Sequence, residues 1–166
     1  MNTIPEQLLA FIEKSPDCFH AVAAMKEELA ANGFKELKEN EKWQVTRGGR
    51  YFVTRNESAL IAFTIPEQDM GGMRILATHS DSPSFKIKEN PEMEAEGHYI
   101  KLNVEKYGGM LCAPWFDRPL SVAGRVVVKD EEKGGMRSVL VNLDRDLVMI
   151  PSLAIHMNRE VNDGYK

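Results

Sequence analysis

Cysteines and long apolar runs are nearly or wholly missing from this chain. Its 166 residues contain 2 cysteines, Cys18 and Cys112, which lie far apart. This is typical of a reducing compartment rather than of a protein built on disulfides. No apolar run approaches the roughly 20 residues that span a bilayer, and the first residues lack the basic and apolar regions of a secretory signal. We therefore expect a cytoplasmic protein with no membrane partner.

An excess of positive charge is missing as well. The chain has 21 Lys and Arg residues against 25 Asp and Glu residues, for a formal net charge of -4. Proteins that bind nucleic acid nonspecifically depend on clustered Lys and Arg, so this class is excluded and no nucleic-acid partner is expected. With 43% hydrophobic and 28% charged residues, the composition is that of a folded protein able to bury a core.

The first third of the chain has the apolar spacing of two helices. Apolar residues in the range 4–12 recur at intervals of three and four, which predicts a first amphipathic helix. We expect Ser15 to cap a second helix, with Pro16 at its first position. An apolar stripe over residues 18–29 forms the inner face of that helix, and Gly33 ends it.

After residue 34 the apolar period changes to two, which is typical of strands. Residues 43–46, 50–54 and 58–63 alternate in this way, and Gly48-Gly49 is one of the turns between them. Residues 74–78 form a short apolar run that is consistent with a fully buried strand.

The later part of the chain is β-rich throughout. Residues 99–105 alternate, and residues 120–129 and 137–143 predict a hairpin. The fold class is therefore α/β over residues 1–90, followed by a mostly β part over residues 91–166.

Common nucleotide-binding, esterase and metal-binding signatures are absent from the sequence, so the histidines become the main candidates. His79 follows the predicted buried strand at residues 74–78, and Asp81 comes two residues later. Imidazole is a common zinc ligand, and its second ring nitrogen is usually held by a carboxylate or a carbonyl. The alternative is an ordinary polar loop, because zinc needs three or four ligands.

The other candidate residues have plainer interpretations beside the functional ones. His156 follows a mostly apolar segment, residues 150–155. It could donate a hydrogen bond to an oxyanion, or it could be a core histidine with a satisfied hydrogen bond. The acidic run at residues 130–132 has the composition of a solvated hairpin tip. The segment at residues 115–119 predicts an interface anchor, with a local turn as the alternative. His20 is expected to be structural, and His98 gives no signal.

Seven segments taken together resemble the aspartyl aminopeptidases, the M18 family of zinc metallopeptidases. They occur in family order and cover nearly all of the chain. The segments are SPDCFHAV, GFKELKENEKW, GGRYFVTRNESALIAF, HSDSPSFKIK, VEKYGG, WFDRPLSVAGRV and IPSLAIHMNR.

The resemblance implies a cytosolic enzyme that removes Asp or Glu from the N-terminus of peptides. In that family two zinc ions sit on an α/β peptidase domain, and an inserted β domain mediates oligomerisation. By this resemblance His79 is a zinc ligand and Asp81 orients it. His156 helps to hold the substrate and the tetrahedral intermediate in a neighbouring subunit. Residues 1–90 then belong to the peptidase domain and residues 91–166 to the inserted dimerisation domain.

Family members are much longer than this chain, and their remaining metal ligands lie beyond the matching positions. We therefore expect residues 1–166 to be an N-terminal fragment that is inactive alone and that forms at least a dimer. The competing hypothesis is a short, non-catalytic protein that acts as an association module.

Overall fold

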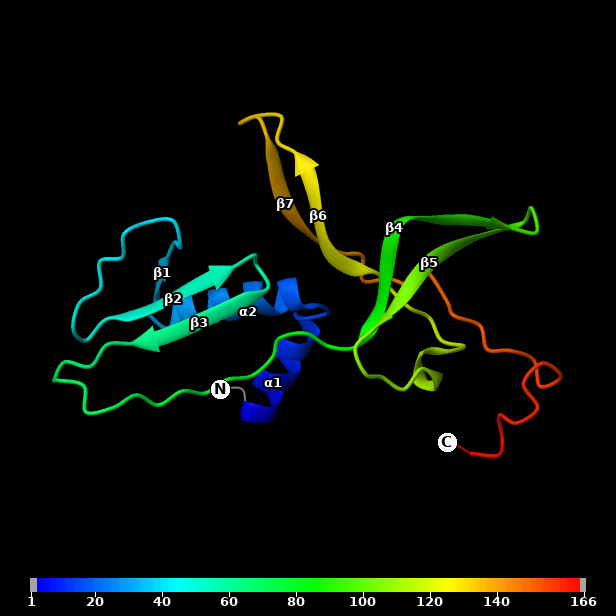
Figure 1. Cartoon of the computed structure of the whole chain (residues 1–166), viewed down its shortest axis with the longest axis horizontal. Helices are drawn as coiled ribbons and strands as arrows, with labels where there is room; N and C mark the ends of the chain where they lie inside the picture. Colours follow the sequence, from blue (N-terminus) through cyan, green and yellow to red (C-terminus); the bar gives the residue numbers. More distant parts are fainter. Residues whose placement is uncertain (1–2, 165–166) are drawn as a thin grey trace. The chain divides into compact units, whose positions relative to one another are not determined.

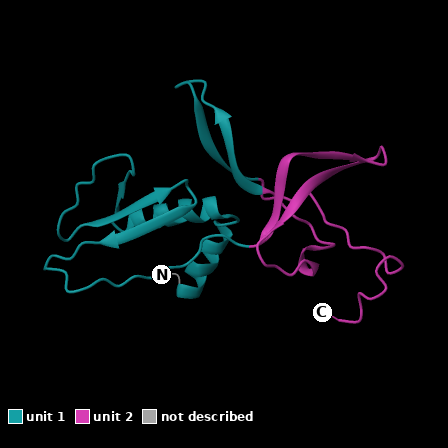
Figure 2. Cartoon of the chain, in the orientation of Figure 1, with its two compact units in different colours: residues 1–82, 123–142 teal, residues 83–122, 143–166 magenta. Residues whose placement is uncertain are grey.

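The computed structural model describes residues 3–164, which divide into two units. Unit 1 comprises residues 3–82 and 123–142, and unit 2 comprises residues 83–122 and 143–164 (Figure 2). Each unit is therefore made of two separate stretches of chain. Figure 1 shows the elements of both along the sequence.

Two helices open unit 1. Helix α1 spans Ile4–Glu13 and helix α2 spans Cys18–Ala31. The second helix begins two residues later than predicted, because Asp17 and not Ser15 is its cap. The Asp17 carboxylate accepts hydrogen bonds from the backbone N–H groups of Phe19 and His20 at 2.8 and 3.0 Å, which satisfies two of the donors that a helix start leaves open.

Gly33 ends helix α2 as predicted. Its φ of +81° lies in the left-handed region, and its N–H donates to the carbonyl of Ala30 at 3.0 Å. The N–H of Phe34 then donates to the carbonyl of Leu29. This arrangement is a common helix stop, because glycine adopts positive φ without steric cost.

A three-stranded sheet in unit 1 lies against helix α2. It consists of β1 (Lys35–Leu37), β2 (Arg50–Arg55) and β3 (Ala59–Thr64), with β2 in the centre. Strand β1 runs parallel to β2, and β3 runs antiparallel to it. The hairpin of β2 and β3 confirms the predicted pair of strands at residues 50–54 and 58–63.

The core of unit 1 is small and centred on β2. Tyr51, Phe52 and Val53 are buried in this strand, together with Ala21 and Val22 of α2. Since side chains alternate along a strand, Phe52 points to the face opposite Tyr51 and Val53. Three consecutive buried residues therefore mean that both faces of β2 are covered.

The predicted strand at residues 43–46 is wrong, because this segment forms no strand in the structure. Trp43 instead stacks on Phe63 of β3 with ring centroids 6.2 Å apart, and its Nε1 donates to the carbonyl of Lys38 at 2.9 Å. The segment is thus held by side chains rather than by a backbone ladder. The turn at Gly49 was predicted correctly, and a Cβ there would collide with the Tyr51 ring.

The predicted buried strand at residues 74–78 is also wrong. These residues form no strand, and Leu76 is 97% exposed. Ile75 is exposed in the same way. A strand needs a neighbouring strand for its backbone hydrogen bonds, and none of the strands that the structure describes pairs with this segment.

Unit 2 contains a long antiparallel hairpin. Strand β4 spans Ser84–Ala95 and β5 spans Tyr99–Tyr107. The register shifts between Ile87 and Glu92, and Asn90 within the shift has a φ of +49°. An irregularity of this kind bends a strand locally, and β4 turns at this point in Figure 1.

The rest of unit 2 is irregular. A short 3₁₀ helix covers Ala113–Trp115, and two isolated bridges join Phe116 to Ile150 and Leu120 to Val148. These bridges hold together two stretches of chain that lie on either side of residues 123–142.

Residues 123–142 return to unit 1 as a second hairpin. Strand β6 spans Ala123–Lys129 and β7 spans Met136–Asn142, in agreement with the predicted hairpin. At its tip Asp130 Oδ1 accepts hydrogen bonds from the N–H groups of Glu132 and Lys133. The acidic run at residues 130–132 is therefore part of a turn, as predicted.

The predicted mixture of helices and strands is confirmed. We predicted two continuous domains, a peptidase part over residues 1–90 and an inserted β part over residues 91–166. The two units are instead each made of two stretches of chain, so they do not test this division, which stays a prediction. No helix within residues 3–164 is long and apolar enough to cross a membrane.

Candidate functional site

His79 and Asp81 interact directly in the structure. His79 Nδ1 lies 2.9 Å from the backbone carbonyl oxygen of Asp81 and 3.1 Å from its Oδ1. The carbonyl oxygen can only accept, and a carboxylate also accepts, so Nδ1 carries the proton and donates to both. His79 Nε2 is then left with its lone pair. The His79 side chain is 80% exposed, so a metal ion can reach this nitrogen.

The loop that carries this pair is hydrogen-bonded to the turn between β2 and β3. Ser80, the residue between the two, donates from Oγ to the backbone carbonyl of Ser58 at 3.1 Å. The preceding residues, 73–78, form no strand. The Ser80 hydrogen bond thus links the loop to the folded part of unit 1.

The chemistry of the pair fits one metal ligand backed by a carboxylate. Neutral imidazole is a common zinc ligand, and a hydrogen bond from its other nitrogen to an Asp or a carbonyl fixes the ring. Across residues 3–164, however, no group of three or more His, Cys, Asp and Glu side chains is placed to hold a metal ion. Since zinc takes three or four protein ligands, this pair covers only part of a site.

His156 lies on an exposed turn in unit 2. The turn is closed by hydrogen bonds from Met157 N to the Ala154 carbonyl at 2.8 Å and from Asn158 N to the Ile155 carbonyl at 3.2 Å. The interpretation of His156 as a core histidine is therefore wrong, because its side chain is exposed. An exposed histidine remains free to serve as a donor to a bound group.

A hydrogen-bonded pair anchors the segment that leads to His156. Asp117 Oδ1 accepts from the N–H of Ser152 at 2.9 Å, and Oδ2 accepts from the Ser152 hydroxyl at 2.5 Å. These bonds to its charged form lower the pKa of Asp117. No local pattern in the sequence indicated this pairing, because 35 residues separate the partners.

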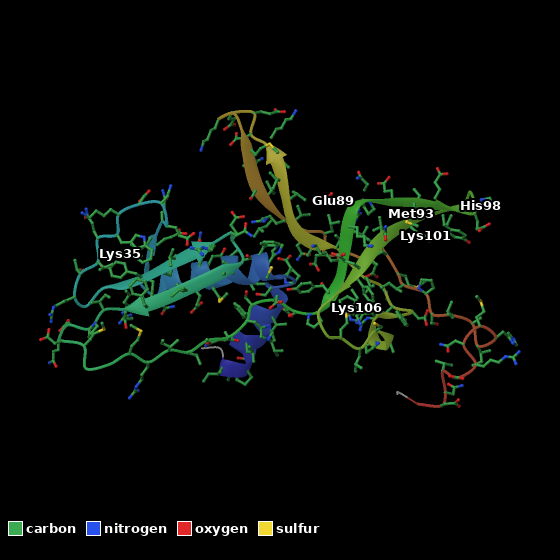
Figure 3. The ribbon with its side chains drawn as sticks, viewed as in Figure 1. Lys35, Glu89, Met93, His98, Lys101 and Lys106 are labelled. Atoms are coloured by element: carbon green, nitrogen blue, oxygen red, sulfur yellow. The ribbon has the colours of Figure 1, made fainter. Side chains whose placement is uncertain are left out.

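His20 and Trp115 make structural contacts. His20 Nδ1 lies 2.6 Å from Asp17 Oδ2 at the start of α2. Trp115 packs against Phe85 with a ring-centroid distance of 5.5 Å and nearly perpendicular planes. The predicted interface role of residues 115–119 stays a prediction. His98 lies at the tip of the β4–β5 hairpin (Figure 3).

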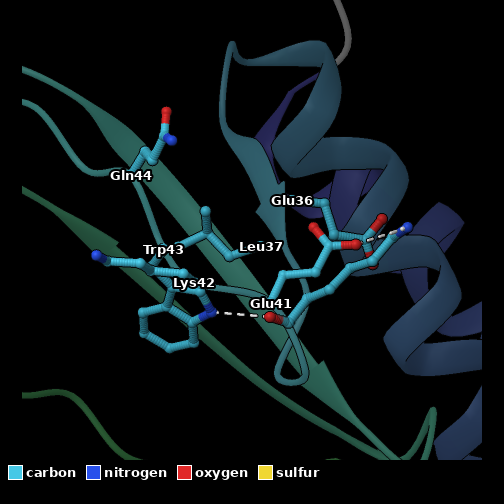
Figure 4. A pocket seen from close by; sticks show the side chains of 7 residues that line it. Glu36, Leu37, Glu41, Lys42, Trp43 and Gln44 are labelled. Atoms are coloured by element: carbon cyan, nitrogen blue, oxygen red, sulfur yellow. Dashed lines mark hydrogen bonds and ion pairs between the residues drawn. The ribbon is translucent and has the colours of Figure 1, made fainter.

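Unit 1 also has a shallow hollow beside β1. It measures about 310 Å³ and is lined by residues 36–38 and 41–44 (Figure 4). Within it Lys38 pairs with Glu41 at 3.3 Å, and Trp43 forms its hydrogen bond to Lys38. None of the four histidines lines the hollow, so it is separate from the candidate residues.

Comparison with known proteins identifies one family. The family model described as aminopeptidase I zinc metalloprotease (M18) matches residues 11–166. A probable M18 family aminopeptidase 2 from Clostridium acetobutylicum is 50% identical over 163 residues, which is 97% of this chain and 38% of that relative. The corresponding protein of Pseudomonas syringae is 44% identical over 160 residues, covering 95% of this chain and 37% of the relative.

Solved structures agree with the sequence comparison. Ape4, in a cryo-EM structure of its complex with Nbr1, matches with a TM-score of 0.87 and 41% identity, covering 96% of this chain and 31% of that one. The mApe1 dodecamer of S. cerevisiae matches with a TM-score of 0.83 and 30% identity, covering 92% of this chain and 36% of the other. The chain thus spans less than two fifths of the length of these relatives.

Proposed function

This chain belongs to the M18 family of zinc metalloproteases, and we propose that it is the N-terminal part of an aminopeptidase that releases Asp or Glu from peptides. The observation that carries the proposal is the family match over residues 11–166, together with relatives named as aminopeptidases that are up to 50% identical to it. The preference for acidic residues rests on the resemblance to aspartyl aminopeptidases.

Three residues take the functional roles in this proposal. His79 binds zinc through Nε2, and Asp81 orients the ring. The contacts of His79 Nδ1 with Asp81 at 2.9 and 3.1 Å support these roles, because they leave Nε2 as the ligating atom. His156, exposed on its turn, contacts the substrate in a neighbouring subunit. Zinc, when bound, supplies an activated water and polarises the scissile carbonyl.

We propose further that residues 1–166 have little or no peptidase activity alone. His79 supplies one ligand, and the described residues hold no cluster of three. The other ligands for two zinc ions then come from the part of M18 chains that this chain does not match. That part is large, because the matched segment is only 38% of the Clostridium acetobutylicum relative.

The proposed assembly is a homo-oligomer, at least a dimer, formed in the cytoplasm through the β part at residues 91–166. One solved relative is a dodecamer, which supports oligomerisation. Domains 1–90 and 91–166 then correspond to the peptidase part and the inserted dimerisation part.

A chimera tests the proposed activity. Residues 1–166 would be joined to the part of the Clostridium acetobutylicum relative that follows its matched segment. We expect the chimera to bind zinc and to hydrolyse Asp- and Glu-N-terminal chromogenic amides but not a Leu amide, with activity abolished by a chelator. The 166-residue chain alone should show neither property. Activity of the short chain, or a chimera that prefers Leu, would contradict the proposal.

Variants of the chimera test the residues. His79→Ala should remove activity and zinc together. Asp81→Asn should lower activity by roughly 10–100-fold, the usual cost of losing a partner of a metal-bound histidine. His98→Ala is the matched control, since His98 lies at the tip of the β4–β5 hairpin, and it should behave like the parent. Full activity of His79→Ala would refute the metal role of His79.

A second candidate function is an association module without catalysis. The exposed apolar side chains of Ile75 and Leu76 favour it, because apolar surface left in water favours association. A folded chimera that is inactive with bound zinc, together with a stable oligomer of the short chain in light scattering, would support this function over peptidase activity.

A further inference from the structure

We propose that Arg125 of the β6–β7 hairpin is a positioning residue for the His79–Asp81 loop. It acts through the turn between β2 and β3 and through Ser80. The functional meaning of this inference rests on the proposed function, in which His79 is a metal ligand. The contacts themselves do not depend on that function.

Arg125 holds the β2–β3 turn by several interactions at once. Its Nη1 donates to the backbone carbonyl of Asn56 at 2.8 Å, to Asn56 Oδ1 at 3.3 Å and to Glu57 Oε2 at 3.1 Å. The guanidinium carbon also lies 4.2 Å from the ring centroid of Phe19 in α2, in a cation–π contact. The Arg125 side chain is only 20% exposed, so water competes little for these bonds.

The turn needs such support because of its backbone conformation. Asn56 and Glu57 have φ values of +51° and +56°, a region that residues other than glycine seldom adopt. The N–H of Ser58 donates to the carbonyl of Arg55 at 3.1 Å and closes the turn. Arg125 binds the Asn56 carbonyl inside this turn, so it stabilises the strained conformation directly.

The β2–β3 turn also holds the loop that carries His79 and Asp81. Ser58, which follows the two strained residues, presents its carbonyl to Ser80 Oγ at 3.1 Å. Ser80 stands between His79 and Asp81. A continuous series of contacts therefore leads from Arg125 through Asn56 and Ser58 to the loop.

The series joins segments that are far apart in the sequence. Arg125 is 69 residues from Asn56, and Ser80 is 22 residues from Ser58. All of them belong to unit 1, to which the β6–β7 hairpin returns (Figure 2). The β6–β7 hairpin therefore supports the His79–Asp81 loop through these contacts, and we call the series from Arg125 to Ser80 the brace.

Solution NMR of the 166-residue chain tests the brace without zinc or activity. Arg125→Ala should speed exchange of the Ser58 amide roughly 10- to 100-fold, the range expected when a hydrogen bond to a charged group is lost. It should also shift the His79 ring signals toward those of free histidine and increase the mobility of residues 79–82. Arg125→Lys keeps the positive charge and one donor nitrogen, so its effects should be smaller than those of Arg125→Ala. Arg137→Ala, exposed on β7 of the same hairpin, is the control and should change neither.

The Ser80→Ala variant tests whether the effect of Arg125 reaches His79 through the Ser80–Ser58 hydrogen bond or through a general loss of order in unit 1. In this variant the Ser58 amide should still respond to Arg125→Ala, but the His79 ring signals should no longer respond to it. His79 signals that are unchanged by Arg125→Ala in the parent chain, or that change equally with and without Ser80, would overturn the proposal. These readouts involve no metal, so failure of the brace and failure of the peptidase function in the chimera are distinct results.

Discussion

Each of the two units is stabilised internally by a different kind of contact. Within residues 3–164, the five buried apolar residues, Ala21, Val22, Tyr51, Phe52 and Val53, all belong to unit 1. In unit 2 no described residue is buried to this degree. Its contacts include the β4–β5 ladder, the bridges of Phe116 to Ile150 and of Leu120 to Val148, the packing of Trp115 on Phe85, and the Asp117–Ser152 pair. Unit 1 should thus respond to changes in core volume, and unit 2 to changes in polar contacts and pH.

The difference has a practical advantage, because each unit contains one tryptophan. Trp43 belongs to unit 1 and Trp115 to unit 2, and they are the 2 tryptophans of the chain. Variants that retain a single tryptophan, made by Trp→Phe substitution, therefore report the unfolding of one unit at a time by fluorescence.

The largest effect is expected from the core of unit 1. Phe52 is 2% exposed, and Phe52→Ala should cost about 3–5 kcal/mol, the usual range for removing a buried phenylalanine. Urea unfolding followed at Trp43 should shift to lower urea or disappear, while the Trp115 signal changes little. The control is Ile61→Ala in neighbouring β3. Ile61 is 67% exposed, so its loss should cost less than about 0.5 kcal/mol. Equal losses from the two variants would contradict the comparison.

An intermediate effect is expected from pH in unit 2. Hydrogen bonds from Ser152 lower the pKa of Asp117 in the folded chain, so the pair stabilises unit 2 at pH values above the ordinary carboxyl pKa of about 3.9. This contribution is lost as the pH falls through the lowered pKa. NMR titration should show Asp117 titrating below its usual range, with the Ser152 amide losing protection over the same interval.

Ser152→Ala is the matching variant for this titration. It removes the hydroxyl donor at 2.5 Å but leaves the backbone donor at 2.9 Å. The pKa of Asp117 should therefore move only part of the way back toward its ordinary value. An unchanged pKa in this variant would show that the hydroxyl contributes nothing to holding the segment before His156.

The smallest effect is expected at the edge of the unit 1 core. Burial raises the pKa of the Cys18 thiol, and the negative charge of Asp17 raises it further. Asn is also a good helix cap, so Asp17→Asn should keep α2 and lower this pKa. In a Cys112→Ser background, iodoacetamide should then alkylate Cys18 faster at pH 8, by less than about tenfold, since tenfold needs a full pKa unit. A slower reaction would contradict the assigned cause.

Local features of the sequence predicted local structure well. Both helices, the β2–β3 hairpin and the β6–β7 hairpin follow from apolar periodicity and turn residues, because each forms from one short, continuous stretch of chain. The most distant pairs in the two hairpins are Arg50–Thr64 and Ala123–Asn142. The displaced cap of α2 is a small error of the same kind. Ser15 and Asp17 are both good capping residues, and only the backbone path decides between them.

Features that need distant partners were missed or predicted wrongly. Residues 74–78 have the composition of a buried strand, but no described strand pairs with them. Residues 43–46 alternate like a strand, but Trp43 holds them through its ring. At the candidate site, the contact of His79 with Asp81 was foreseen because the residues are two apart. The roles of His79, Asp81 and His156 stay predictions.

The sequence by itself determined the two helices, the β2–β3 and β6–β7 hairpins, the family and the His79–Asp81 contact, because each depends on residues close in sequence or on a pattern along the chain. Strand β4, and with it the β4–β5 hairpin, was not predicted. Only the tertiary structure placed Arg125 on the β2–β3 turn and Asp117 on Ser152. Those pairs are 69 and 35 residues apart, and either contact forms only after the chain between the partners has folded and brought them together. A side chain's partner across such a distance is set by the path of the backbone, which no local pattern encodes.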